Sequence, residues 1–337
     1  MKYRTFKNPV ITLAALLMIS LSAFAQQNHD DNNEQVKNYS KSYAADDNDK
    51  LQIDNRYGKV TVNTWNKNEF KIEVQVKVEA KDQSATKKLL DNVTISDSKS
   101  GSTVSFQTNI DKQSTSWNSW FTVGNSYRKM EVNYTVYMPA KNALNINNKY
   151  GSIELPNLDG KVLINLSYGS LSAKSLTNAD NEINVGYGSV NIENLSGNNL
   201  DVKYGSLTLG SADKLTANVS YSAVKIGKLN TFGNFSIKFS GGFQIADLGK
   251  NLKSLSVNSS YTNIRLGLSG DENADFNVTV TYGSFNYGSH TVNISDKTAQ
   301  GNKRGWRPTQ NYTGYLGKGN AEKVINITSR YGSVKLD

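Results

Sequence analysis

A Tyr-Gly-Ser tripeptide recurs at short, nearly constant steps along this chain of 337 residues. It begins at Tyr150, Tyr168, Tyr187, Tyr204, Tyr282 and Tyr331, with variants at Tyr57, Tyr221 and Tyr261 and a degenerate copy at Ser240-Gly241-Gly242. The first four steps from Tyr150 are 18, 19, 17 and 17 residues. A period this short is too small for a helical hairpin, and it predicts one coil of a β-solenoid per repeat.

The apolar residues keep a fixed phase around each tyrosine. An apolar residue lies four positions before the Tyr (Ile164, Ile183) and another lies three positions after it (Leu171, Val190). Alternation along a strand predicts that the first of these residues and the Tyr face inward together, so we expect the Tyr column to stack in the core. The step of three breaks the period of two. It therefore marks a corner between two strands, where Gly permits a tight backbone.

A polar column lies three residues before most tyrosines, as in Asn147, Asn165, Asn184 and Asn218. Alternation places these side chains on the outside. Two interpretations stay open. Stacked amides can hydrogen-bond from coil to coil as a structural ladder, or they can form a flat polar face that grips a repetitive ligand.

The pattern predicts an all-β protein. It is a parallel β-solenoid (β-helix) of about nine to ten short rungs, with an N-terminal β-sheet cap that carries one short helix. We expect a signal peptide at 1–25, a polar lead-in at 26–50, and a cap region with the first rung at 51–148. The repeat region is expected at 149–337, with an insertion at 297–320 and a last rung at Tyr331. Long strands are expected at 70–78 and 130–137, a strand near Tyr39–Tyr43, and a helix at 84–92.

The first 25 residues resemble a secretory signal. Three cations (Lys2, Arg4 and Lys7) precede an uncharged apolar run at 10–24, and Ala23-Phe24-Ala25 fits a cleavage site. The apolar run is short for a membrane-spanning helix, which needs about 20 residues, and no second run approaches that length. We therefore expect export to the periplasm, cell surface or exterior, with no transmembrane segment after cleavage.

The composition leaves few groups for catalysis. The chain has no Cys and two His, which excludes a thiolate site and a Cys nucleophile. Four residues after each Tyr, where a solenoid enzyme needs grouped carboxylates, the chain has a single acid, Glu154. We expect no catalytic residues, no cofactor and no metal site. The net charge is +9, but the basic residues are spread along the sequence and form no dense cluster. We therefore expect no nucleic-acid partner.

Two insertions combine aromatic and basic residues. Aromatic side chains mixed with Arg on loops are typical of contact surfaces, although the rings could equally fold back over the ends of the solenoid. The candidate partner-binding residues are Trp117, Trp120 and Tyr127 in the first insertion, and Arg304, Trp306, Arg307, Tyr312 and Tyr315 in the second.

The export signal, the segment LQIDNRYGKVTVNTW at 51–65, the short helix and the recurring YGS rungs resemble a known family. It is the putative-adhesin family of bacterial cell-envelope β-solenoid proteins, a domain of unknown function with YGS repeats. The resemblance implies a fold, and it carries over no functional residues. The expected function is an exported, non-catalytic, adhesin-like protein that binds a glycan or an envelope or surface protein. The alternatives are a polysaccharide-active β-helix enzyme and a periplasmic structural or sensing partner of a membrane regulator.

Overall fold

The computed structural model describes residues 33–111, 128–268, 273–300 and 308–337. The expected signal peptide at 1–25 lies outside these residues. Within them the protein is all-β with one helix, and 21 strands belong to one sheet that is not closed. No described helix is long and apolar enough to span a membrane.

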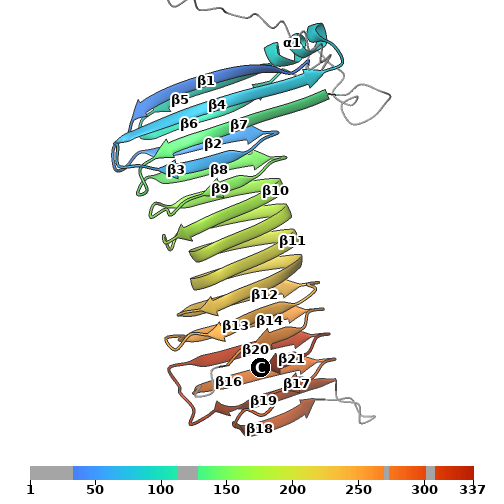
Figure 1. Ribbon diagram of the computed structural model, residues 1–337. Coiled ribbons are helices and arrows are strands. Elements are labelled where there is room, and N and C mark those ends of the chain that lie inside the picture. Colours follow the sequence, from blue (N-terminus) through green and yellow to red (C-terminus); the bar gives the residue numbers. More distant parts are fainter. Residues whose placement is uncertain (1–32, 112–127, 269–272, 301–307) are drawn as a thin grey trace, which may run out of the picture. The chain divides into compact units, whose positions relative to one another are not determined.

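The N-terminal part combines long antiparallel strands with the first parallel pairs (Figure 1). Its strands are β1 (Gln35–Ala44), β2 (Lys50–Arg56), β3 (Val60–Thr64), β4 (Glu69–Ala80), β5 (Val93–Ser100), β6 (Thr103–Ile110) and β7 (Arg128–Met138). The strands expected near Tyr39–Tyr43, at 70–78 and at 130–137 are thereby confirmed as β1, β4 and β7. β1 and β7 flank β4 in antiparallel pairs, while β2 pairs in parallel with β6 and β3 with β7.

The single helix, α1 (Gln83–Asp91), lies against β4 and confirms the helix expected at 84–92. Asp82 caps its N-terminus, where the carboxylate accepts a hydrogen bond of 2.8 Å from the Ala85 amide. Leu89 is buried and Leu90 is partly buried against the core. Thr86 is also fully buried, and its hydroxyl accepts the Ala80 amide at 2.9 Å, which fixes the helix to the end of β4.

From β8 onward, parallel strands stack one above another along one axis (Figure 1). They are β8 (Ala143–Lys149), β9 (Ile153–Leu155), β10 (Val162–Leu176), β11 (Glu182–Leu229), β12 (Phe232–Lys238), β13 (Phe243–Leu248), β14 (Ser254–Ser260), β15 (Ile264–Leu266), β16 (Ala274–Thr281), β17 (Phe285–Asn286), β20 (Val324–Arg330) and β21 (Val334–Leu336). Two further strands, β18 (Val292–Gln300) and β19 (Thr309–Leu316), pair antiparallel. The pairing keeps the repeat in register, since Ile164 faces Ile183 and Gly169 faces Gly188. We call one such turn of chain, with a Tyr-Gly corner between its two strands, a rung.

The predicted apolar phase is confirmed. Every residue four positions before and three positions after a repeat tyrosine is buried, and these residues belong to one continuous core cluster. At about 25 cal/mol per Å² of apolar surface, burial of this unbroken cluster is the main term that stabilises the stack. The rung around Phe239 has one extra residue after the corner, so its second buried residue, Phe243, comes four positions after the ring instead of three. Phe235 and Phe243 are both buried, and their rings are in contact.

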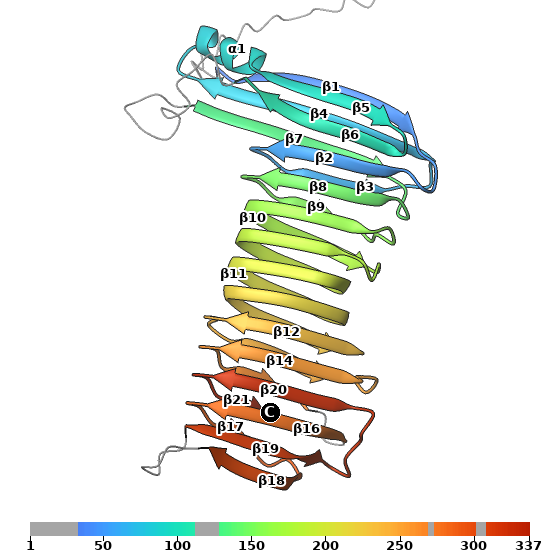
Figure 2. The same cartoon turned by 180° about the vertical axis from the view of Figure 1, so that it is seen from behind.

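The last rung in the sequence is not the last in space. β20 pairs in parallel with β14 on one side and with β16 on the other, so the segment ending at Asp337 is inserted between two earlier rungs. The insertion expected at 297–320 contributes β19, which pairs antiparallel with both β16 and β18 (Figure 2). The stack therefore ends on an antiparallel hairpin rather than on the Tyr331 rung. A β-bulge near Ile294 interrupts the edge strand β18, which is a common protection against edge-to-edge pairing.

Candidate functional site

A column of ten stacked aromatic rings runs along the corner of the rungs. Its members, in spatial order, are Tyr57, Tyr150, Tyr168, Tyr187, Tyr204, Tyr221, Phe239, Tyr261, Tyr331 and Tyr282. We call this column the aromatic ladder. Neighbouring ring centroids lie 4.7–5.3 Å apart, and the rings are within 15° of parallel. The spacing is that of adjacent strands, which shows that the backbone pairing sets the positions of the rings.

The aromatic ladder lies on the outside of the protein, so the expectation that the tyrosines stack in the core is wrong. The Tyr187 side chain is 52% exposed, and most other ladder members are similarly exposed. The cause is the backbone, since all ten residues have a left-handed φ between 52° and 62°. One left-handed residue breaks the alternation and turns its side chain outward, and the strand beyond the corner then returns to its inward phase.

The corner glycine is required by close packing. At Gly188 a β-carbon would lie 1.8 Å from the carbonyl oxygen of Gly169, and at Gly205 it would lie 1.7 Å from that of Gly188. These glycines have no left-handed φ, so the expectation that Gly supplies the unusual angle is corrected: the tyrosine adopts it. Where the corner residue is Ser222, its hydroxyl accepts the Gly205 amide at 2.9 Å.

The polar column on the outer face forms the expected amide ladder over part of its length. The Asn165 amide donates to the Asn147 side-chain oxygen at 2.9 Å, and the Asn184 amide donates to that of Asn165 at 3.1 Å. These bonds occupy the amides with one another, which favours the structural interpretation for these three residues.

Seven hydroxyls of the aromatic ladder are available to a partner. Within the described parts of the chain, no intramolecular hydrogen bond is formed by the hydroxyls of Tyr150, Tyr168, Tyr187, Tyr204, Tyr221, Tyr261 and Tyr331. The ring faces are covered by neighbouring rings, so the accessible part of each is its edge and its hydroxyl. The ladder therefore offers a straight row of hydrogen-bonding groups at strand spacing. The repeat pattern predicts the tyrosine members of the ladder but not Phe239, which lacks the Tyr and stands one residue before the degenerate copy at Ser240.

Few of the candidate partner-binding residues are described. Trp117, Trp120, Tyr127, Arg304, Trp306 and Arg307 lie outside the described residues. Tyr312 is on β19 and only 6% exposed, and its ring packs 5.3 Å from that of Phe285. Its ring folds back over the end of the stack, which is the second of the two interpretations left open for the insertions. Tyr315, on the opposite face of β19, is 36% exposed.

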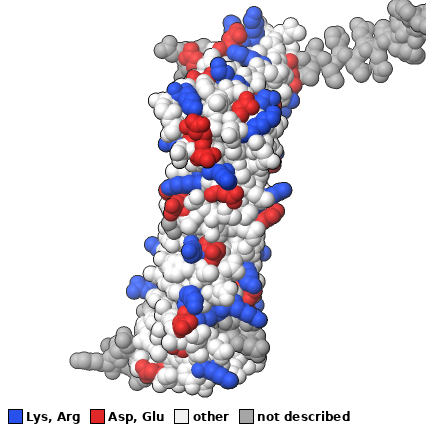
Figure 3. Space-filling view, turned by 90° about the vertical axis from the view of Figure 1, so that its left-hand side faces the viewer, with Lys and Arg blue, Asp and Glu red and all other residues white. Residues whose placement is uncertain are grey.

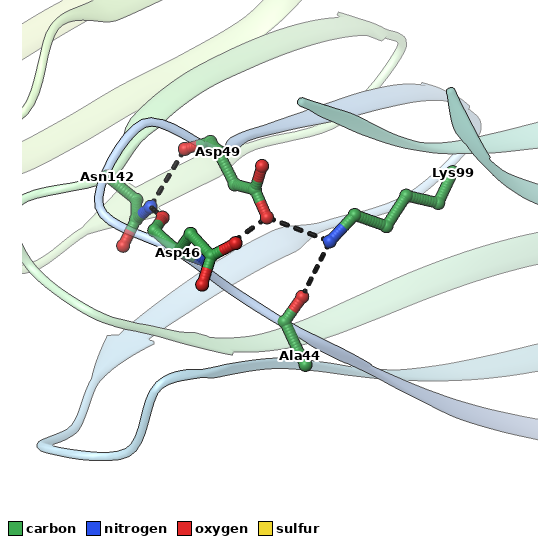
Figure 4. Close-up of polar contacts among 5 residues, drawn as sticks. All are labelled: Ala44, Asp46, Asp49, Lys99 and Asn142. Atoms are coloured by element: carbon green, nitrogen blue, oxygen red, sulfur yellow. Dashed lines mark hydrogen bonds and ion pairs between the residues drawn. The ribbon is translucent and has the colours of Figure 1, made fainter. Parts of the chain in front are cut away.

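A polar cluster joins three chain segments of the cap (Figure 4). Lys99 donates to the Asp49 carboxylate at 2.8 Å and to the Ala44 carbonyl at 3.0 Å. The Asn142 amide donates to the carbonyls of Asp46 and Asp49 at 2.7 and 2.8 Å. The Lys99 hydrogen bond, then that of the Asp46 amide, lowers the pKa of Asp49 below its usual value. The Lys99 ammonium and the Asn142 amide each form two hydrogen bonds within the cluster, which is the arrangement of a structural joint.

A hollow of about 480 Å³ lies over β1, β4 and β7. Its lining residues are Asn38, Tyr39, Ser40, Glu73, Val74, Gln75, Asn133 and Thr135. Glu73, the single carboxylate among them, is paired with Lys71 at 2.6 Å. A glycosidase needs two carboxylates at such a site. Among the described residues, no group of three His, Asp or Glu could hold a metal ion.

Comparisons with known proteins give distant structural similarities. No protein-family model matches the sequence, and no curated protein matches it. A solved "putative adhesin" from Bacteroides fragilis NCTC 9343 is 12% identical, with 89% of this chain and 97% of that chain covered and a TM-score of 0.30. A "putative cell adhesion protein" from Clostridium sporogenes ATCC 15579 is 11% identical, with 90% and 99% covered and a TM-score of 0.24. A "putative lipid binding protein" from Parabacteroides distasonis ATCC 8503 is 11% identical, with 89% and 97% covered and a TM-score of 0.40.

Proposed function

We propose that the protein is an exported, non-catalytic, adhesin-like β-solenoid of about nine to ten rungs in the bacterial cell envelope. It binds a glycan or protein partner along the aromatic ladder. The signal-like segment at 1–25 supports export. Further contacts with the partner come from the candidate residues in the two insertions: Trp117, Trp120, Tyr127, Arg304, Trp306, Arg307 and Tyr315.

The aromatic ladder is the observation that carries this proposal. Each left-handed non-glycine residue costs about 1–2 kcal/mol, and stacking returns about 0.5–1.5 kcal/mol per ring pair. Compared with a Gly at the same position, which has no such cost, these terms nearly cancel, so the stability of the fold gives little reason to keep ten exposed rings instead of glycines. Stacking also needs no hydroxyl, yet nine of the ten ladder positions are Tyr. A row of outward hydroxyls is useful for binding a long partner.

The test has two parts. Protease treatment of intact cells, followed by fractionation, locates the protein, and an array of glycans and matrix proteins identifies a partner. We expect the purified protein to bind at least one partner on the array. Replacing three neighbouring ladder residues (Tyr168, Tyr187 and Tyr204) by Phe should weaken that binding and leave the fold intact, because stacking is kept and the hydroxyls are lost. Unchanged binding by this variant would rule out the ladder as the contact surface.

If the protein is protected from protease in intact cells and is released by osmotic shock, it lies in the periplasm. That result would refute the adhesion role and favour a periplasmic one. Turnover of a polysaccharide by the purified protein would refute the non-catalytic assignment.

A further inference from the structure

The residue immediately before each ladder ring is basic or neutral, and never acidic. In spatial order these residues are Arg56, Lys149, Ser167, Gly186, Lys203, Ser220, Lys238, Ser260, Arg330 and Thr281. The register of the parallel strands stacks them into a line beside the rings. We call its five cations, Arg56, Lys149, Lys203, Lys238 and Arg330, the basic column. All five side chains are exposed.

Most of the basic column has no intramolecular counter-charge. Lys203 pairs with Asp201 at 3.0 Å, while the described residues provide no ion pair for Arg56, Lys149, Lys238 or Arg330. The Lys149 ammonium lies 5.0 Å from the centre of the Tyr150 ring, so cation and ladder form one surface.

Several lysines away from this column are neutralised locally. Lys161 pairs with Glu182 at 2.6 Å, Lys228 with Asp247 at 3.3 Å and Lys253 with Glu322 at 3.4 Å. On the side of the molecule drawn in Figure 3, basic and acidic side chains are likewise interspersed.

The exposed part of the aromatic ladder also favours negative charge. An aromatic ring has a negative face and a positive edge, and stacking covers the faces while leaving edges and phenol hydroxyls outward. The edges and O–H donors of the ladder, together with the basic column, therefore attract the carboxylate or sulfate groups of a ligand. Neutral sugars stack on ring faces, which the ladder does not offer.

We propose that the aromatic ladder and the basic column together bind an extended acidic polysaccharide, which names the ligand class of the proposed adhesin-like function and rests on it. Lys203, Lys238 and Arg330 recur at every second rung, roughly 10 Å apart at strand spacing. This spacing fits a chain with one acidic group per disaccharide. Nucleic acid fits less well, because duplex DNA carries a charge about every 1.7 Å and single strands need free aromatic faces on which bases stack.

Affinity electrophoresis of the purified protein tests this proposal, with hyaluronan, which has one carboxylate per disaccharide, and dextran sulfate as acidic probes and dextran as the neutral probe. We expect retardation by at least one acidic probe and none by dextran. The triple variant K149Q/K238Q/R330Q should lose roughly tenfold or more in affinity. The control K161Q/K228Q/K253Q removes the same charge from paired lysines and should stay within about twofold. Equal losses in the two variants would show that net charge alone is responsible and would overturn the proposal.

A gain-of-function variant guards against misfolding as an explanation. Gly186 lies in the gap between Lys149 and Lys203, and a β-carbon there meets nothing within 4 Å. G186K extends the basic column and should raise affinity for the acidic probe; an unchanged or lower affinity contradicts the inference.

Tighter binding of single-stranded DNA than of either acidic probe would also overturn the inference. Binding on the glycan and protein array without binding of acidic probes would refute this inference alone, whereas no binding in either assay would refute the proposed function as well.

Discussion

Gly188→Ala tests whether the close contact between neighbouring rungs requires Gly at the corner. A β-carbon at Gly188 would lie 1.8 Å from the Gly169 carbonyl oxygen, whereas real β-carbon contacts begin near 3.0 Å, so the backbone must move by about 1.2 Å. This movement disturbs the parallel pairing around Ser167–Gly186 and Gly169–Gly188, and we expect it to break about two inter-strand hydrogen bonds. Two lost bonds cost about 2 kcal/mol, and overpacking adds about 1–3 kcal/mol. We expect a loss of about 3–5 kcal/mol.

Gly186→Ala is the matched control, because the same change in the same rung meets open space. It should be neutral or stabilise by up to about 1 kcal/mol, since Ala restricts the unfolded chain. Chemical denaturation followed by circular dichroism measures both variants. The midpoint and the slope are compared together, since stacked repeats can unfold in more than one step. A Gly188→Ala midpoint within error of wild type, or equal losses in the two variants, would refute the reasoning.

Three further predictions concern the ladder and the cap. Tyr187→Ala should destabilise by about 1–3 kcal/mol through two lost ring contacts, and Tyr187→Gly by less, since Gly adopts the left-handed φ freely; thermal melts that rank them in reverse would contradict this. Asn142→Ala should cost about 1–3 kcal/mol in denaturant, because the Asp49 carbonyl loses its donor while the Asp46 carbonyl keeps the Asp49 amide; a near-neutral effect would exclude the cluster as a joint. The pKa of Asp49 is lowered in the folded protein, so its stabilising contribution is present above the unfolded pKa near 3.9 and is lost as pH falls through the folded value. Lys99→Met should move acid unfolding to higher pH, and an unchanged acid midpoint would show that Lys99 is not the cause.

The basic column could have been found in the sequence. Arg56, Lys149, Lys203, Lys238 and Arg330 each stand directly before a ladder ring. The position four residues after each Tyr, where a solenoid enzyme needs acids, carries no information about this column. A basic residue at one fixed repeat position is a signal as regular as the tyrosine itself, and it becomes meaningful once the ladder is known to face outward.

The sequence by itself determined the local structure: the strands, their inward apolar residues, the helix after Asp82 and the repeat that sets the register. Each of these depends on neighbours a few residues apart, through alternation, capping or fixed spacing. Only the tertiary structure decided which way the tyrosines face, why corners such as Gly188 require Gly, where β20 is inserted and that Tyr312 covers the end of the stack. These depend on contacts between rungs. A single left-handed residue reverses a side chain without changing the hydrophobic pattern, and the distance from Gly188 to the Gly169 carbonyl exists only after two rungs have stacked.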